Sequence, residues 1–549
     1  MSRASDKPRG KKYRARAEEM RKTAALLLSA AVLLGWDSGA APAWAKTFRW
    51  AAAADVDSLD PYSRRETFLL SFLGNIYEPL VRRGRDSALE PDLATDWAQA
   101  APLVWRFHLR RSVRFQDGSP FSADDVVFSF IRATSENSKL GLVLSAIQSV
   151  RKVDAYTVDI VTNLPDPILP QEIASWDIMS KAWCEQNDST APADLADDQS
   201  NYAVAHANGT GPFLVLEREP GADIVLAPYS AWWDKPAHNL DRAVFRPIAD
   251  DNARVAALQS GEIDMIYSVP PQSIDRLAHA PGIRLVHGPG LTTIFLGFDQ
   301  SRAALMGSNV KGANPFKDIR VREAVAYAID ENTIVAKVMR GLATPAALLV
   351  GPGIEGFDPA LNQRPDYDPA EARRLLAEAG YPKGFAIDMD CPTDRYVNDE
   401  AICQEVVAML AKVDVQVRLN AKPRAQFFDK IFDPGWRSSF YLLGWTASSH
   451  DAFNALNNLA ATRSPAQHQG EYNIGGYSNP DLDRLLAGIR ADTNPSKRRG
   501  RLGQALALVR ENFAYIPLHQ QDVVWAARDT IELVQPADDS FPLRYVRVK

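Results

Sequence analysis

Residues 439–451 read Ser439-Phe440-Tyr441-Leu442-Leu443-Gly444-Trp445-Thr446-Ala447-Ser448-Ser449-His450-Asp451. The apolar first half is typical of a strand buried on both faces, although a run this short also fits a buried helix. The composition then changes, because Gly444 allows close backbone approach and Trp445 brings a wide amphipathic ring. Ligands lie beyond the carboxyl ends of strands in sheets flanked by helices. We therefore expect the floor of a ligand cleft here, with Trp445 as a wall, unless it is a core tryptophan followed by an ordinary loop.

The residues before this stretch alternate between strand and helix patterns. Strands are predicted at 386–390 and 415–419, helices at 399–410 and around 427–431, and the strand at Phe440 comes next. This β-α-β-α-β order predicts a parallel sheet flanked by helices. Arg395 and Trp445 each follow a strand of that sheet, so we expect both on the same rim.

The length and composition of the chain indicate a soluble protein of several domains. Its 549 residues are too many for one core, so two or three domains are expected. The apolar content of 46% and the charged content of 24% are ordinary for globular proteins. No run after residue 45 resembles a membrane helix.

The first 45 residues have the pattern of a secretory signal peptide. Residues 1–22 carry nine Lys or Arg, residues 23–36 are apolar, and Ala43-Trp44-Ala45 fits a cleavage site. The basic leader is long, so Met20 is an alternative start. Cleavage leaves 53 basic and 64 acidic residues, a net charge of −11, which argues against nucleic-acid binding. We expect a periplasmic, soluble product. No cysteine lies near the cleavage site, so we do not expect a lipid anchor.

Several distinctive motifs follow one another along the chain. The longest is Trp-Arg-Phe-x-Leu-Arg-x-x-Val-Arg-Phe-x-Asp-Gly-x-Pro-Phe-x-Ala-Asp-Asp-Val over residues 105–126. The other motifs are Tyr77-Glu78-Pro79-Leu80, Pro91-Asp92-Leu93-Ala94, Gly209-Thr210-Gly211-Pro212-Phe213, residues 257–264, 316–324 and 367–372, and Gly475-Gly476-Tyr477-Ser478-Asn479-Pro480. In this order they resemble one family, the extracytoplasmic solute-binding proteins of ABC importers, family 5, which contains oligopeptide, dipeptide and nickel binders. The resemblance covers nearly the whole mature chain.

The resemblance implies an α/β, two-lobed periplasmic-binding-protein fold of type II. Lobe one would comprise 46–298 and 517–549, with an extra subdomain at about 86–205, and lobe two 299–516. Chain crossings near Phe298-Asp299 and Leu518 would form the hinge. The partners implied are a peptide or other small ligand and a membrane permease with its ATPase. We expect a monomer that captures peptides or peptide-like solutes.

Two ligand contacts also follow from the resemblance. Peptide-binding members pair a ligand carboxylate with an arginine at the position of Arg395, and a guanidinium suits this task because it bonds a carboxylate bidentately. The same members carry Gly-Trp-x-x-Asp, whose Asp takes the ligand's amino group, but here that position is Ser448. An unpaired buried ammonium is costly. Either Asp451 compensates, although a helix cap before Ala452 is the role that its position favours, or the ligand lacks a free amine.

The predicted ligand-binding residues are therefore Arg395, Trp445, Thr446, Ser448 and Asp451. For Arg395 the alternative is that it is a solvent-facing loop residue without contact to a ligand. Of the three cysteines, Cys391 follows a predicted strand and Cys403 lies in the next helix, so we expect this pair to form a disulfide, with three buried thiols as the alternative.

No enzymatic signature accompanies these residues. The sequence lacks His-Glu-x-x-His, Cys-x-x-Cys and Gly-x-Ser-x-Gly, so we expect no catalytic residues, no metal and no cofactor. Gly351-Pro-Gly353-Ile-Glu-Gly356 has a nucleotide-type glycine spacing, but a proline-rich loop follows it instead of a helix. A secreted hydrolase, or a ligand sensor using the same cleft, remain the alternatives.

Overall fold

The computed structural model describes residues 46–549 except 65, 142, 196–198, 433–436 and 468. The predicted signal peptide, residues 1–45, lies outside the described residues. Within the described part, no helix combines the length and apolar character that crossing a membrane requires.

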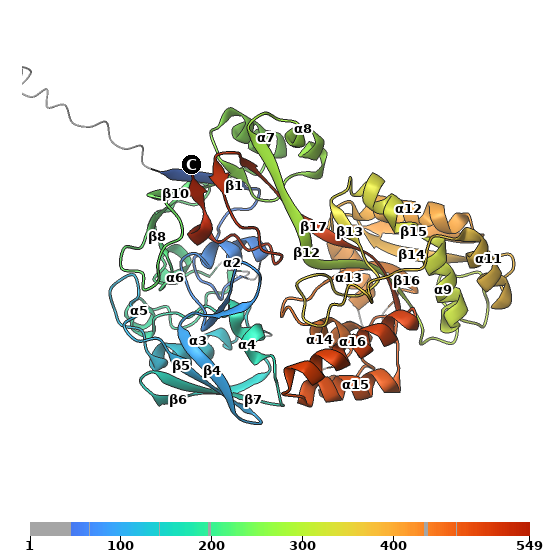
Figure 1. The fold of residues 1–549 in the computed structure, drawn as a ribbon, viewed down its shortest axis with the longest axis horizontal. Coiled ribbons are helices and arrows are strands. Elements are labelled where there is room, and N and C mark those ends of the chain that lie inside the picture. Colours follow the sequence, from blue (N-terminus) through green and yellow to red (C-terminus); the bar gives the residue numbers. More distant parts are fainter. Residues whose placement is uncertain (1–45, 65, 142, 196–198, 433–436, 468) are drawn as a thin grey trace, which may run out of the picture. The chain divides into compact units, whose positions relative to one another are not determined.

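One mixed sheet of eleven strands, counted over the described residues, organises the fold (Figure 1). Its strands are, in spatial order, β15 (Val415–Lys422), β14 (Phe385–Pro392), β16 (Phe440–Thr446), β12 (Ile283–Phe298), β17 (Tyr515–Arg528), β11 (Met265–Ile266), β1 (Thr47–Ala52), β10 (Arg242–Pro247), β9 (Ile224–Pro228) and β8 (Phe213–Glu217), and β13 (Ala343–Pro345) also pairs with β17.

The predicted parallel unit is confirmed. Strand β14 pairs in parallel with both β15 and β16, and the connecting helices are α12 (Asp399–Ala411) and α13 (Arg424–Phe432). The sheet as a whole is mixed, because β16 pairs antiparallel with β12. The carboxyl ends of β14 and β16 therefore lie at the same edge of the sheet, as the sequence predicts.

Strand β16 is buried on both faces, which is the structure its apolar run predicts. Phe440 and Leu442 pack into one hydrophobic core, and Tyr441 and Leu443 pack into another on the opposite face. Alternate residues of a strand point to opposite faces, so every position from 440 to 443 must be apolar. Helices α9 (Ile319–Ala328), α11 (Pro369–Glu378) and α12 contribute to the first core, and α13, α14 (Ala452–Ala455), α15 (Pro480–Ala491) and α16 (Pro495–Glu511) to the second.

Two long strands connect this region with the rest of the chain. Strands β12 and β17 run side by side in Figure 1, and their pairing is interrupted between Pro289 and Thr293. Before the interruption, Ile283 of β12 packs into a core that also contains Ala51 and Ala526, from the two ends of the chain. After the interruption, Ile294 and Phe295 pack into the two cores on either face of β16. The crossings predicted near Phe298-Asp299 and Leu518 lie farther along the same two strands and stay a prediction.

The remaining strands form a separate four-stranded antiparallel sheet and two small ribbons. The four strands lie within the predicted subdomain of about 86–205, and helix α3 packs beside them, capped by Ser122. The strands are β4 (Ala94–Ala101), β5 (Val104–Leu109), β7 (Thr157–Thr162) and β6 (Ile147–Asp154), with ribbons β2 (Val81–Arg83)–β3 (Leu89–Pro91) and β18 (Ile531–Glu532)–β19 (Arg547–Val548). The other helices are α2 (Thr67–Leu73), α3 (Ala123–Ala133), α4 (Leu169–Glu172), α5 (Lys181–Gln186), α6 (Tyr202–Ala205), α7 (Asp251–Ser260), α8 (Ile274–Ala278) and α10 (Glu331–Thr333).

Candidate ligand-binding site

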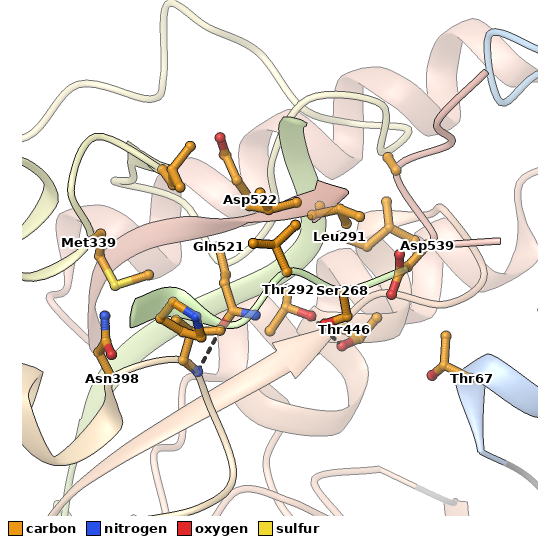
Figure 2. Close-up of a pocket in the computed structure, with 18 of the residues that line it drawn as sticks. Thr67, Ser268, Leu291, Thr292, Met339, Asn398, Thr446, Gln521, Asp522 and Asp539 are labelled. Carbon is orange, nitrogen blue, oxygen red and sulfur yellow. Dashed lines mark hydrogen bonds between the residues drawn. The ribbon is translucent and has the colours of Figure 1, made fainter. Parts of the chain in front are cut away.

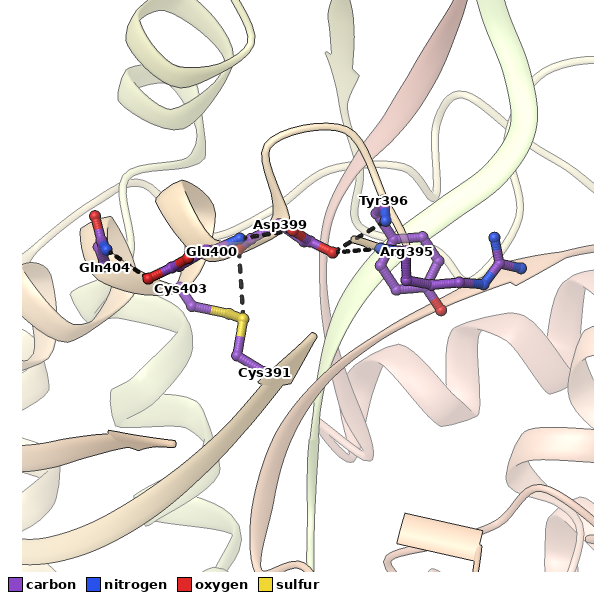
Figure 3. The surroundings of a disulfide bond; sticks show 7 residues. All are labelled: Cys391, Arg395, Tyr396, Asp399, Glu400, Cys403 and Gln404. Carbon is purple, nitrogen blue, oxygen red and sulfur yellow. Dashed lines mark hydrogen bonds between the residues drawn. A yellow bond between two sulfur atoms is a disulfide. The ribbon is translucent and has the colours of Figure 1, made fainter. Parts of the chain in front are cut away.

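Arg395 lies on a tightly held loop between β14 and α12 (Figure 3). The buried carboxylate of Asp399, the first residue of α12, accepts hydrogen bonds from the backbone N–H groups of Arg395 (2.9 Å) and Tyr396 (3.1 Å). A disulfide between Cys391 at the end of β14 and Cys403 in α12 closes the same segment. This is the cysteine pair that the sequence favours, and it leaves Cys184 as a buried free thiol.

Removal of the disulfide is expected to destabilise this segment. The bridge closes a segment with a sequence separation of 12 residues, and loops of this size are stabilised by about 3 kcal/mol in the chain-entropy account. The Cys391→Ser/Cys403→Ser variant should therefore unfold at lower urea concentration than the oxidised wild type. A reductant should shift the wild type to the same midpoint and leave the variant unchanged. Identical midpoints for variant and oxidised wild type would contradict this expectation.

A close contact connects the Arg395 loop to the end of β16. The Tyr396 hydroxyl donates to the Gly444 carbonyl oxygen (3.2 Å), and the Tyr396 ring lies against the Gly444 Cα. A Cβ at position 444 would come within 2.6 Å of the Tyr396 ring and 2.8 Å of the Ile294 side chain. Glycine is therefore required here for the close backbone approach that the sequence predicts.

Gly444→Ala is expected to lower the free energy of unfolding by about 1–3 kcal/mol, the range observed when a packed core receives an extra methyl group. The displaced Tyr396 ring should also shift the Arg395 loop and weaken ligand binding. Gly500→Ala is a matched control, because a Cβ there meets no atom within 4 Å and alanine favours the helix α16. Urea unfolding of both variants gives the comparison, and equal stability of the two would contradict the packing account.

The guanidinium of Arg395 is available to a ligand. It lies 5.0 Å from the Tyr396 ring centroid, and among the described residues it has no carboxylate partner. Its side chain lines a cavity of about 310 Å³, which is also bordered by Thr446 and Asn398. Figure 2 shows Thr446, Leu291, Thr292 and Gln521 around this cavity.

A larger cavity of about 700 Å³ adjoins the first. The two cavities share four lining residues: Thr67, Leu291, Thr446 and Asp538. We refer to the two cavities together as the paired cavities. Ser448 lines the larger cavity, on the loop that follows β16. Three of the predicted ligand-binding residues, Arg395, Thr446 and Ser448, therefore line these two adjoining cavities.

Trp445 does not line either cavity. Its indole N–H donates to the Asn454 side-chain oxygen (2.8 Å), and its ring packs against Tyr472 with the centroids 5.0 Å apart. The partly buried indole instead joins the core behind β16. Thr446 and Ser448, which follow Trp445 in the chain, line the cavities instead.

Asp451 is fully buried and has two structural roles. It accepts from the Phe453 backbone N–H (2.9 Å) and so caps α14. Its carboxylate also pairs bidentately with the Arg498 guanidinium, one contact being 2.9 Å. Of the two roles that the sequence leaves open, the geometry here is that of a cap and a buried ion pair, and Asp451 lines neither cavity.

Charged residues from the early part of the chain, which are not among the predicted ligand-binding residues, also line the larger cavity. Glu78 and Asp92 belong to the family motifs at residues 77–80 and 91–94, and Arg82 and Arg83 lie between these motifs. Asp177 stands alone between buried Trp176 and Ile178. A single carboxylate inside an apolar run was the signal that could have identified it.

One of these side chains connects distant parts of the chain across the larger cavity. The Arg83 guanidinium donates to the carbonyl oxygens of Ser449 (2.9 Å) and Ser87 (3.1 Å). Burial lowers the pKa of Arg83 to about 10, while the charge of Asp538 acts in the opposite direction. Arg83 therefore remains protonated at neutral pH and joins β2 to the loop that carries Ser448.

Residues 88–466 match the family described as "Bacterial extracellular solute-binding proteins, family 5 Middle". The match spans more than half of the chain, and the chain belongs to this family. The resemblance predicted from the motifs is therefore confirmed.

Two relatives and one solved structure illustrate the similarity. The glutathione-binding protein GsiB of Pectobacterium atrosepticum is 28% identical over 470 residues, which cover 84% of this chain and 86% of that protein. Heme-binding protein A of Haemophilus influenzae is 28% identical over 467 residues, covering 81% of each. The structure of HbpA2 from Haemophilus parasuis is 25% identical with a TM-score of 0.79, covering 92% of this chain and all of that one. The predicted two-lobed periplasmic-binding-protein fold is confirmed.

Proposed function

We propose that this chain is the substrate-binding component of an ABC importer and captures peptides or peptide-like solutes in the paired cavities. The liganded protein would deliver its solute to a membrane permease coupled to an ATPase. It would act as a monomer in the periplasm after removal of residues 1–45.

The observation that carries this proposal is the position of the Arg395 guanidinium at the smaller cavity. Its guanidinium lines a cavity without a carboxylate partner among the described residues, while its backbone is held by Asp399 and the disulfide. A cation held in place and left unpaired suits a ligand carboxylate, because the bidentate hydrogen bonds then form without ordering the loop.

The named ligands of the relatives are consistent with this chemistry. Glutathione and haem are different in shape, yet each carries two carboxylates that an arginine can receive. For this chain we favour a peptide-like ligand, because the connected volumes of about 310 and 700 Å³ are bordered by both charged and apolar side chains.

Strands β12 and β17 supply a suitable hinge. Their pairing is interrupted between Pro289 and Thr293, so few backbone hydrogen bonds between the two strands oppose bending there. We place the division between the lobes at this interruption. A ligand would favour the closed arrangement only through its higher affinity for that arrangement. The Arg83 contact to Ser449 joins residues from the two sides of this division.

Isothermal titration with a defined panel tests the proposal. The panel contains glutathione, trialanine, haem, and the carboxyl-amidated form of each peptide. We expect binding of at least one peptide, with loss of affinity on amidation and with no product formed. Peptide hydrolysis would support the hydrolase alternative instead, and absence of binding across the panel would contradict the proposal.

A further inference from the structure

Among the described residues, five with a carboxylate line the larger cavity. These are Glu78, Asp92, Glu172, Asp177 and Asp538. A buried carboxylate is costly unless it is paired or hydrogen-bonded. The partners of each residue therefore reveal whether the cavity holds a group that awaits a ligand.

Two of these carboxylates have partners among the side chains of lobe one. Glu78 accepts from the indole N–H groups of Trp232 and Trp233, both at 2.8 Å. Asp92 lies 3.5 Å from the Arg82 guanidinium, although its oxygens meet no hydrogen-bond donor among the described residues. Glu78 is therefore hydrogen-bonded, and Asp92 has a cation within ion-pair distance.

Two more are bonded within their own neighbourhoods. Glu172 shares a side-chain hydrogen bond with Asp166. Burial, followed by the charge and the hydrogen bond of Asp166, raises the pKa of Glu172 well above its usual range. Asp538 accepts from the backbone N–H (3.0 Å) and the hydroxyl (2.7 Å) of Ser540.

Asp177 differs from all four. Its side chain meets no hydrogen-bond donor and no cation among the described residues, although the residue is only 7% exposed. The Tyr62 hydroxyl donates to its carbonyl oxygen (2.6 Å), and a bridge to Pro79 fixes the backbone. Burial, and to a smaller extent the charge of Glu78, raises the pKa of Asp177 to about 7.

We propose that Asp177 receives a cationic nitrogen of the ligand, either an α-ammonium or the cationic group of a side chain. This inference rests on the proposed function. It answers the question raised by Ser448, which lines the same cavity but cannot neutralise an amine. The counter-charge comes from the opposite lobe instead of from the Gly-Trp-x-x-Asp position.

The chemistry of the site favours an organic cation over a metal ion. One carboxylate is a poor metal site, since Ca²⁺ and Mg²⁺ take six or more oxygen ligands. The described residues include no group of three or more His, Cys, Asp or Glu arranged to hold a metal ion. The preferred ligand is thus a zwitterion, with a carboxylate at Arg395 and a cationic nitrogen at Asp177.

The test compares Asp177→Asn with the wild type by isothermal titration against five peptides: glutathione, trialanine, the N-acetyl form of each, and N-acetyl-Ala-Lys-Ala. The wild type should bind its preferred cationic peptide about 30-fold more tightly than the matched peptide without a cation. In Asp177→Asn this preference should disappear, while the affinity for the uncharged-terminus peptides stays the same. Trialanine against N-acetyl-Ala-Lys-Ala identifies which nitrogen is received.

Asp159→Asn is the matched control, because it removes one carboxylate of lobe one that pairs with Arg106 and lines neither cavity. It should keep the full preference. Asp177→Ser is a second variant should Asp177→Asn fail to fold. An unchanged preference in the Asp177 variants, with peptides still bound, would overturn this inference alone. No binding of any peptide to the wild type would overturn the proposed function and this inference together.

Discussion

Arg395→Ala is expected to weaken binding of a carboxylate-bearing ligand by at least about 30-fold and to abolish its thermal shift. Removing one partner of a desolvated charge pair in a complex costs 2–5 kcal/mol, and tenfold in affinity corresponds to about 1.4 kcal/mol. The melting temperature without ligand should hardly change, because the exposed guanidinium lies over the Tyr396 ring and has no carboxylate partner among the described residues. Differential scanning fluorimetry and titration measure both quantities.

Arg340→Ala provides the control for the general effect of positive charge. Arg340 lines the same cavity, but its guanidinium already pairs with Asp275 at 2.7 Å. We expect the affinity of this variant to stay within about fivefold of the wild type, since exposed ion pairs contribute at most about 1 kcal/mol. Equal losses in the two variants would mean that the charge of the cavity matters and the position of Arg395 does not.

Asp451→Ala is expected to reduce the free energy of unfolding by about 4 kcal/mol in the absence of ligand. The substitution leaves the Arg498 guanidinium buried without its partner, which typically costs 3–5 kcal/mol. It also removes the cap of α14. Urea unfolding followed by tryptophan fluorescence measures the loss.

Two further variants separate these contributions. Asp368→Ala removes a cap from α11 at an exposed site, and we expect about 1 kcal/mol. The double variant Asp451→Ala/Arg498→Met should recover part of the loss, because no unpaired charge remains. If Asp451→Ala instead keeps its stability and loses ligand affinity, Asp451 is a ligand contact.

Local patterns were sufficient to predict the region around β16. The apolar run at residues 440–443 requires burial on both faces, and the alternating strands and helices before it require parallel pairing. The close approach at Gly444 also follows from the residue type. These features depend on neighbours within one β-α-β unit, so periodicity and glycine placement carry the information.

Long-range partners explain what the sequence left open. Asp451 meets Arg498, which is 47 residues away, and Trp445 turns toward Asn454 and away from the cavities. Asp177 reaches the larger cavity through a bridge to Pro79, almost one hundred residues earlier in the chain. No local pattern encodes such pairs, so the choice between cap and ligand contact, or between wall and core, requires the fold.

Native mass spectrometry of the protein purified from its native host tests the central claim most directly. We expect the wild type to retain a stoichiometric small solute that contains a carboxylate, and Arg395→Ala to be recovered without it while remaining folded. Retention of the same solute at the same occupancy by Arg395→Ala would contradict the account.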